Sequence, residues 1–255
     1  MILRLAEAPN AYEPLGSDED LVITEQYVLF LGRGPDPALN CAQRLRLAPG
    51  SVATTVDEIR ALVRKRGGRG LTWEVGTPAT PPDLADRLLA LGMVPAREPV
   101  AVAMALREAP SPAPAGVTVF RVETVDAFRT YVSITHEVFG MQDLLSEELE
   151  RIDREGEHDL AMAGFVRYLA RIDGEPVGAA SATFTEWGVV LHAGCTKLEA
   201  RGRGVYRALV AARWRDAVRR GTPVLVTRAG SMSRPILRRL GFQELAEIRI
   251  LLDEF

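Results

Sequence analysis

A glycine-rich turn between a strand-like and a helix-like stretch constrains the fold of this chain most. Residues 199–209 read EARGRGVYRAL, after an apolar run that ends at Thr196 and before residues with the spacing of an amphipathic helix. Gly202 and Gly204 let the backbone turn tightly and leave its amides bare, and the first amides of a helix have no intrahelical acceptor. The segment therefore predicts a strand–turn–helix unit that binds an anion.

The helix that follows is expected to cover 204–220 and to end at Gly221. Its apolar stripe is formed by Tyr206, Val210, Trp214 and Val218, which recur at steps of four residues. We expect this stripe to face the core. The charged residues Arg207, Arg213, Arg215 and Asp216 are expected to face away from it.

The rest of the C-terminal half shows a clear order of elements. Two strand-like runs flank Asp173-Gly174, a dipeptide typical of tight hairpin turns. Thr124 is expected to cap the N-terminus of the helix that begins there. The expected elements are strand 117–122, helices 124–139 and 141–156, hairpin 166–184, strand 187–196, the helix described above, strand 223–228, helix 233–240 and a closing strand or hairpin in 241–255. Consecutive strands favour antiparallel pairing and the later β-α-β segment favours a parallel crossover. The fold class is therefore α/β, with a mixed, mostly antiparallel sheet and helices on both faces.

A proline-rich segment, REAPSPAPAGV at 107–117, indicates a linker that divides the chain. We expect an N-terminal domain at 1–108, a linker at 109–116 and a C-terminal domain at 117–255. The last part of the first half reads helix, strand, helix ending in LGM, strand, and the second half ends helix, strand, helix ending in LGF, strand. This similarity indicates a weak internal repeat whose first copy lacks the glycine turn.

Three classes of ligand fit a glycine turn before a helix. A P-loop needs Gly-Lys-Ser/Thr at its end, whereas Lys197 precedes the glycines here. A dinucleotide site needs a third glycine where Arg207 stands, and too few strands follow to build that fold. An NADP-dependent oxidoreductase domain, with Arg228 near a 2′-phosphate, is therefore a remote alternative. The third class is coenzyme A.

The stretch CTKLEARGRGVYRALV, followed by VLVT and ILRRLGF, resembles the GCN5-related N-acetyltransferase (GNAT) family. That family has the motif Gln/Arg-x-x-Gly-x-Gly/Ala at a strand-to-helix turn. Arg201 and Gly204 match its first and fourth positions, and Tyr206 departs from the sixth. The resemblance covers 117–255 and implies two tandem acyl-CoA N-acyltransferase-like domains, of which the N-terminal one is degenerate.

The resemblance implies an acetyl-CoA-dependent N-acetyltransferase that transfers an acetyl group to a primary amine of a small molecule or peptide. It implies that backbone amides of the turn hold the pyrophosphate and that the preceding strand borders the pantetheine arm. The implied cofactor-binding residues are Gly194, Cys195, Thr196, Arg201, Gly202, Arg203, Gly204, Val205, Tyr206 and Arg207. The N-terminal domain is expected to shape the acceptor cleft or to form a homodimer contact.

Direct attack of an amine on a thioester requires a proton acceptor. His192 is the first candidate, because strand parity places it with Val190, Gly194 and Thr196 and because histidine titrates near neutral pH. The alternative for His192 is a hydrogen-bonded histidine of the core. Glu186 is a second candidate, with a solvated turn carboxylate as its alternative, and Cys195 is expected to pack in the core.

The tyrosine that serves as general acid in that family is replaced by Leu237 in this sequence. Together with Tyr206, this departure keeps a non-catalytic acyl-CoA-binding or sensing module as the alternative function.

Composition excludes several other roles. The formal net charge is −3, so neither nucleic acid nor an anionic membrane is an expected partner. The N-terminus MILRLAEAPN does not resemble a secretory signal, and two distant cysteines suggest neither a disulfide framework nor a metal site. We expect a cytoplasmic protein. An acidic run in helix 141–156 is compatible with a cationic acceptor, although a solvated helix face is the favoured interpretation; it comprises Asp143, Glu147, Glu148 and Glu150.

Overall fold

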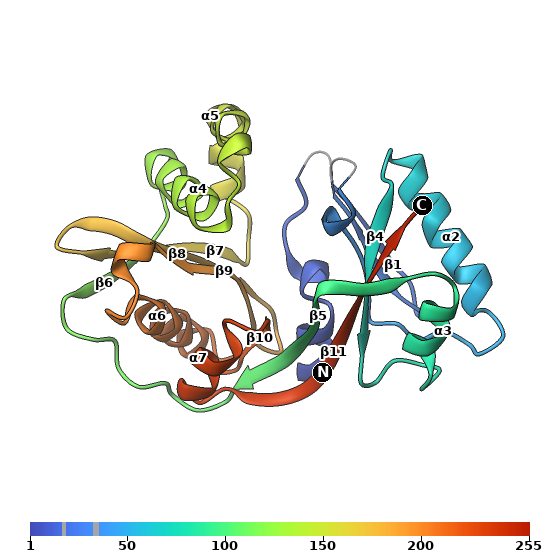
Figure 1. Ribbon diagram of the computed structural model, residues 1–255. Helices are drawn as coiled ribbons and strands as arrows, with labels where there is room; N and C mark the ends of the chain where they lie inside the picture. The colour runs from blue at the N-terminus through green and yellow to red at the C-terminus, as the bar shows by residue number, and fades with distance from the viewer. Residues whose placement is uncertain (17–18, 33–35) are drawn as a thin grey trace. The chain divides into compact units, whose positions relative to one another are not determined.

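The computed structural model describes residues 1–16, 19–32 and 36–255, which form two compact units (Figure 1). Unit 1 contains Met1–Ala105, Arg228–Arg239 and Gln243–Phe255, and unit 2 contains Leu106–Thr227 and Leu240–Phe242. The units are not the two contiguous halves expected from the sequence, because the end of the chain packs with the N-terminal residues. Among the described residues, no helix has the length and apolar character needed to cross a bilayer.

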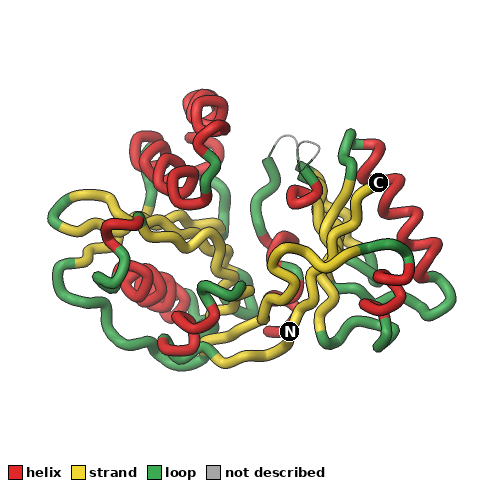
Figure 2. The backbone as a smooth tube through the Cα atoms, viewed as in Figure 1, coloured by secondary structure: helices red, strands yellow, loops and turns green. Residues whose placement is uncertain are grey.

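Unit 2 is built on antiparallel strands with helices on both sides. Its elements are β6 (Val117–Arg121), α4 (Val125–Phe139), η3 (Gln142–Leu144), α5 (Leu145–Leu160), β7 (Phe165–Ile172), β8 (Glu175–Phe184), β9 (Val189–Thr196), η4 (Leu198–Ala200), α6 (Val205–Arg219) and the start of β10 (Leu225–Ala229). The strands lie in the order β10-β9-β8-β7-β6. Helices α4 and α5 cover one face and α6 covers the other, as the sequence predicted (Figures 1 and 2).

Local signals in unit 2 formed as expected. Asp173 and Gly174 have φ values of 52° and 87°, which suit the tight turn between β7 and β8. The Thr124 hydroxyl accepts a hydrogen bond from the Ala127 amide at 3.2 Å and caps α4. Helix α4 ends at Gly140, whose left-handed φ of 73° is typical of a helix C-terminus.

Unit 1 is likewise built on a β-sheet that is packed with helices. Its elements are α1 (Ile2–Glu7), η1 (Pro9–Tyr12), β1 (Asp20–Ile23), β2 (Val28–Leu31), η2 (Pro37–Leu39), β3 (Asn40–Gln43), α2 (Val52–Lys65), β4 (Gly70–Gly76), α3 (Leu84–Ala90), β5 (Val94–Leu106), α7 (Arg234–Arg239) and β11 (Gln243–Glu254). The strands lie in the order β1-β2-β3-β4-β11-β5. The sequence predicted the helices α2 and α3 and most strands, but missed α1 and the short β3.

The C-terminal strand β11 lies between β4 and β5 in unit 1. It pairs antiparallel with both, from Gly70 to Gly76 on β4 and along most of β5. Its side chains contribute to the unit's core, since Leu251 packs in the cluster that contains the fully buried Trp73. The core of unit 1 therefore depends on residues from both ends of the chain.

The internal repeat is confirmed by topology. Strand β3 pairs parallel with β4 across helix α2, and β9 pairs parallel with β10 across helix α6. The glycine after each following helix, Gly92 after α3 and Gly241 after α7, has nearly the same left-handed φ, 95° and 93°. The order of elements is thus repeated along the chain, although the last helix and strand of the second copy lie in unit 1.

The expected orientation of α6 is wrong. Arg213 and Asp216 are buried, 1% and 2% exposed, whereas Val218 is 52% exposed. Both charged residues face the sheet because each finds polar partners there: Arg213 donates to the Ser181 carbonyl and Asp216 accepts from Tyr168. Helical spacing alone defines a face, but the partners on the sheet decide which face turns inward.

Candidate functional site

The glycine turn that the sequence singled out lies at the N-terminus of α6. Gly202 and Gly204 have left-handed φ values of 78° and 81°, and Gly204 is the N-cap residue. The amides of Val205, Tyr206 and Arg207 form the first turn, where no intrahelical acceptor exists. These three amides and the positive end of the helix dipole make a local anion-binding site.

The two glycines have different surroundings. A Cβ on Gly204 would lie 2.6 Å from Cγ of Pro114, a residue of the proline-rich segment, whereas a Cβ on Gly202 would meet nothing within 4 Å. Gly204 therefore allows the proline-rich segment to pack against the turn. Gly202 keeps the space in front of the turn open.

The arginines of the turn have distinct roles. Arg201 reaches back from the turn, with its Nε 3.5 Å from the Thr196 carbonyl oxygen. The exposed Arg203 side chain lies 3.6 Å from Asp173 at the β7–β8 turn, a contact that contributes little stability. The Nε of Arg207 is buried and has no hydrogen-bond partner in the described part of the chain.

Two further buried polar groups near the turn lack ordinary partners. In the described residues, Oγ1 of Thr196 at the end of β9 has no hydrogen bond, and neither does Nη2 of Arg213 on α6. Buried donors without partners are rare, so each one calls for an explanation such as a ligand or water. Of these atoms, the Arg207 Nε and the Thr196 Oγ1 fit a ligand that carries phosphate and polar amide groups, as coenzyme A does, whereas Arg213 lies deeper in α6 and acts on Tyr206.

Strand β9 contains a β-bulge beside the turn. Ala179 of β8 pairs with Cys195, but Ser181 pairs with His192, so two residues of β9 lie opposite one residue of β8. The additional residue is accommodated at Ala193, whose φ is 43°. A bulge leaves part of the backbone outside the ladder and reverses the alternation of side chains.

The bulge corrects the predicted position of His192. Its register with Ser181 places it on the α4 face together with Cys195, which packs in the α4 cluster. Gly194 faces α6 instead, because a Cβ there would lie 2.9 Å from the Tyr206 ring. Strand parity failed because it assumed an unbroken alternation from His192 to Gly194.

His192 lies in a mostly buried environment, with 9% of its surface exposed. Its Nε2 is 3.0 Å from Oγ1 of Thr183, and its ring centroid is 6.0 Å from that of Phe165. On the same face Arg167 stacks over Phe165, with Cζ 4.7 Å from the ring centroid. His192 is thus a hydrogen-bonded histidine in an aromatic and cationic environment.

The other candidates lie apart from these groups. Glu186 is exposed in the turn before β9, and Cys195 is buried, which raises the pKa of its thiol to about 11. Leu237 is buried on α7 in unit 1 and offers no proton. Cys195 therefore packs as expected and is not an activated nucleophile.

The acidic run of α5 is partly neutralised. Both carboxylate oxygens of Glu148 accept from Arg151, at 3.0 and 2.8 Å, and Arg151 also pairs with Asp159. The hydrogen bonds that Arg151 donates to Glu148 and Asp159 outweigh burial and raise the pKa of Arg151. Glu148 is therefore paired within α5, whereas Asp143 and Glu150 are exposed.

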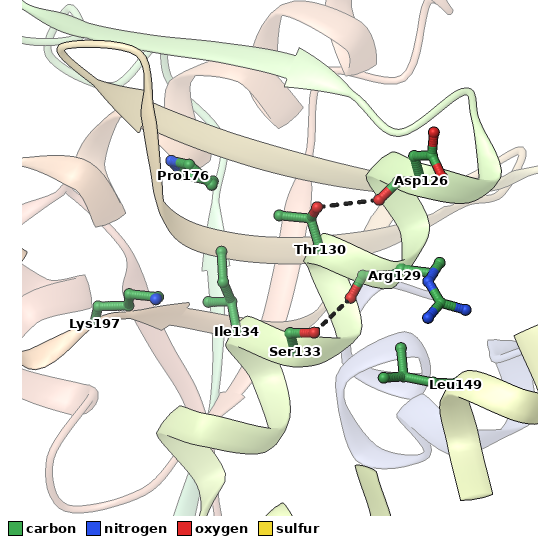
Figure 3. Close-up of a pocket in the computed structure, with 8 residues that line it drawn as sticks. All are labelled: Asp126, Arg129, Thr130, Ser133, Ile134, Leu149, Pro176 and Lys197. Atoms are coloured by element: carbon green, nitrogen blue, oxygen red, sulfur yellow. Dashed lines mark hydrogen bonds between the residues drawn. The ribbon is translucent and has the colours of Figure 1, made fainter. Parts of the chain in front are cut away.

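A separate surface pocket of about 350 Å³ lies along α4 (Figure 3). Its lining residues are Asp126, Arg129, Thr130, Ser133, Ile134, Leu149, Pro176 and Lys197. The two hydroxyls bond to carbonyls of their own helix, while Arg129 pairs with Asp153 and Lys197 with Glu137. None of the predicted site residues is among the residues that line this pocket, and its two cationic side chains are already paired with carboxylates.

Comparison with known proteins identifies the fold. No protein-family model matches the chain, and no curated protein matches it in sequence. A GCN5-related N-acetyltransferase from Kribbella flavida matches 99% of this chain and 95% of its own, with a TM-score of 0.73 and 21% identity. A tandem GNAT protein from the clavulanic acid biosynthesis pathway matches 99% of this chain and 93% of its own, with a TM-score of 0.65 and 17% identity.

A third similar structure is a GCN5-related N-acetyltransferase from Sphaerobacter thermophilus, with a TM-score of 0.60 and 19% identity over 97% of this chain and 84% of its own. Matches over nearly the full length include both halves of the chain. The chain therefore has the fold of GCN5-related N-acetyltransferases in its tandem form, which confirms the resemblance read from residues 195–242.

Proposed function

We propose that the chain is an acetyl-CoA-dependent N-acetyltransferase that acetylates a primary amine. The observation that carries the proposal is the bare turn at the N-terminus of α6. Beside it lie the Arg207 Nε and the Thr196 Oγ1, which have no hydrogen-bond partner in the part of the chain that the structure describes. The fold shared with N-acetyltransferases supports the same interpretation.

The cofactor would be held mainly by backbone. Amides from Gly202 to Arg207 would bind the pyrophosphate, and Arg201 reaches back to the Thr196 carbonyl beside them. The edge of β9 at Gly194, Cys195 and Thr196 would border the pantetheine arm, because its recorded pairing with β10 covers only Val189 and Val190. Bound acetyl-CoA supplies an acyl group activated as a thioester.

The chain's own groups would then serve the attacking amine. His192 accepts a proton from the amine nitrogen, and Thr183 orients its ring through Nε2. A backbone amide that the bulge at Ala193 releases from the ladder is a suitable donor to the developing oxyanion. The exposed Glu186 would carry the proton onward to solvent.

Unit 1 has no equivalent glycine turn. The residue before α2 is Ser51, with ordinary negative φ of −106°, and no glycine with positive φ precedes it among the described residues. We therefore assign unit 1 a structural role, either in shaping the acceptor cleft or in homodimer formation.

Calorimetry tests the ligand class. The wild-type protein is titrated with CoA and with NADP, and CoA is expected to bind while NADP does not. Gly202→Glu places a carboxylate in front of the turn and should weaken CoA binding at least tenfold. Gly202→Ala is the matched control, since it carries the same backbone strain without the charge. Binding of NADP alone would contradict the proposal.

Turnover tests the reaction. Free thiol released from acetyl-CoA is followed with a panel of primary amines, and His192→Ala is expected to lower kcat about 10²–10⁴-fold. Tight CoA binding without turnover on any amine, and without an effect of His192→Ala on binding, would favour the non-catalytic acyl-CoA-binding module instead.

A further inference from the structure

The side chain of Tyr206 extends from the first turn of α6 back to strand β9. A Cβ on Gly194 would lie 2.9 Å from Cε2 of Tyr206 and 3.5 Å from its hydroxyl oxygen. Only glycine leaves room for this ring. The hydroxyl is therefore held at the level of the β-bulge, and not among the amides of the glycine turn, where its sequence position alone would place it.

Arg213 lies behind this phenol as a buried cation. It is 1% exposed, its Nε donates to the Leu209 carbonyl at 3.1 Å and its Nη1 donates to the Ser181 carbonyl at 3.3 Å. Its Nη2 has no hydrogen bond of ordinary geometry in the described residues. Tyr206 lies seven residues before Arg213 on α6, which is about two helical turns and places both side chains on the same face of the helix.

The groups that act on the Arg213 charge are unusual. Burial lowers its pKa, and the groups that oppose this effect are the phenols of Tyr206, Tyr168 and Tyr131 and the thiol of Cys195. No carboxylate is among these largest influences. A buried cation surrounded by neutral acids favours the anionic form of the group nearest to it, because that form compensates its charge.

The bulge separates two proton-transfer groups onto opposite faces of β9. His192 lies on the α4 face, in register with Ser181, and Tyr206 covers the α6 face at Gly194. A group that accepts a proton and a group that donates one thus flank the same short segment of strand, from His192 to Gly194.

We propose that Tyr206 is the catalytic acid that protonates the departing sulfur and that Arg213 is the positioning residue that stabilises its phenolate. The proposal rests on the proposed acetyl transfer. The amine nitrogen forms its bond to the acyl carbon, the carbon–sulfur bond breaks, and the bonding pair leaves with sulfur. The Tyr206 hydroxyl proton passes to that sulfur, and the amine proton passes to His192. Solvent then supplies a new proton to the Tyr206 oxygen and removes the proton from His192.

The other ionisable groups near β9 do not fit this role. Cys195 faces the α4 core, Glu186 is exposed in the turn before the strand, and Leu237 carries no ionisable proton. The ionisable groups that act on the Tyr206 phenol are Arg213 on its own helix and, from the opposite face of β9, the thiol of Cys195. Burial raises the pKa of the Tyr206 phenol and Arg213 opposes that rise, so the phenol is protonated at neutral pH and ready to donate.

The first test removes the hydroxyl and keeps the ring. Tyr206→Phe is compared with wild type in thiol release from acetyl-CoA with the best amine of the panel, and in calorimetry with CoA. We expect kcat to fall about 10²–10⁴-fold while the Kd for CoA changes less than about twofold, and the fall in kcat at alkaline pH to disappear. Tyr27→Phe is the matched control: it removes a buried phenol of unit 1 that bonds to Glu58 and should leave kcat unchanged.

The second test does not need turnover. 3,5-Difluorotyrosine at position 206 brings the phenol ionisation near neutral pH and gives a ¹⁹F signal in the free protein. The titration midpoint is expected to rise by about one pH unit when Arg213→Met is added, because the stabilising cation is lost. Arg213→Lys, which keeps the charge, should recover part of the shift.

The outcomes separate the two proposals. Wild-type turnover with an unchanged kcat in Tyr206→Phe would overturn the role of Tyr206 and leave the acetyltransferase function standing. An unchanged ¹⁹F midpoint in Arg213→Met would overturn the role of Arg213. A wild-type protein that neither binds CoA nor releases thiol would contradict the proposed function itself, whatever the titration shows.

Discussion

Gly202 and Gly204 share nearly the same left-handed backbone but differ in what surrounds them. A side chain at either position is strained by about 1 kcal/mol. Only at Gly204 would a methyl group also contact Pro114, with a Cβ–Cγ separation of 2.6 Å. The second glycine therefore serves packing as well as backbone geometry.

This difference predicts unequal effects of alanine. Gly202→Ala should lower the free energy of unfolding by about 1 kcal/mol, and Gly204→Ala by about 1–3 kcal/mol more, because of the overpacked contact with Pro114. Urea unfolding measures both. The double variant Gly204→Ala/Pro114→Ala should recover the additional loss. Equal losses in the two single variants would show that Pro114 does not confine the turn.

Asp216 is a buried carboxylate whose pKa reflects competing effects. Burial alone would raise it, but hydrogen bonds from Tyr168, Arg219 and Arg121 lower it overall. The Tyr168 hydroxyl donates at 2.7 Å and Arg121 Nε at 2.9 Å. An aspartate with a lowered folded-state pKa stabilises the protein above its unfolded pKa of about 3.9, and that stabilisation is lost as the pH falls through the folded-state pKa.

Asp216→Asn should therefore destabilise the protein by about 2 kcal/mol at pH 7 and by less at acid pH. Urea unfolding at pH 7 and pH 3 gives the comparison. Asp173→Asn, at a carboxylate that is 87% exposed, is the control and should show no such dependence. A difference between wild type and Asp216→Asn that stays constant with pH would contradict the assigned linkage.

At the scale of elements, helix α4 shows a boundary that local chemistry decides. Thr124 caps its first turn through the Ala127 amide, and Asp126 in that turn complements the helix dipole. The sequence predicted this cap because threonine before an amphipathic run is a local signal, independent of the rest of the fold.

Thr124→Ala should lower the free energy of unfolding by about 1 kcal/mol, whereas Thr124→Ser should keep most of the stability. Thermal or urea unfolding is the measurement. If Thr124→Ser lost as much stability as Thr124→Ala, the threonine methyl group and not the hydroxyl would be the stabilising feature.

Helix α6 and strand β9 show where local patterns stop being sufficient. The stripe of Tyr206 and Val210 suggested one buried face, but Arg213 lies at the same helical spacing and is buried as well. Its burial depends on the Ser181 carbonyl of a distant strand. Charged side chains are rarely buried without partners, so Arg213 was expected to face away from the core. The Ser181 carbonyl supplies the partner that allows its burial.

At the scale of the whole molecule, unit 1 depends on the last residues of the chain. Asp253 of β11 is 2% exposed and accepts from Arg60 at 2.7 Å and from the indole of the fully buried Trp73 at 3.1 Å. These bonds and the ladders to β4 and β5 make β11 an internal strand. An internal strand contributes hydrogen bonds on both edges and apolar area on a face.

Residues 1–108 alone should therefore not fold stably, although the proline-rich segment begins there. Circular dichroism of the 1–108 fragment should report an unfolded chain. In a longer protein that carries Trp187→Phe/Trp214→Phe, deletion of 243–255 should shift the fluorescence of Trp73 to that of a solvent-exposed indole, because unit 1 loses β11. In the full chain, Asp253→Ala should cost about 3–5 kcal/mol, because it leaves Arg60 without its buried partner. A stably folded 1–108 fragment would contradict the assigned role of β11.

The sequence by itself determined the features that depend on neighbouring residues. These are the types and order of most helices and strands, the Asp173-Gly174 turn, the Thr124 cap and the glycine turn before α6. Each rests on backbone geometry or on contacts within about one helical turn or one hairpin, which a short stretch of sequence encodes.

Only the tertiary structure decided the features that depend on distant partners. The bulge at Ala193 turned His192 and Gly194 to opposite faces, the sheet buried Arg213 beside Tyr206, and β11 entered unit 1. Strand register and the satisfaction of buried charges are set by contacts between residues far apart in the chain, and these contacts leave no periodic pattern in the local sequence.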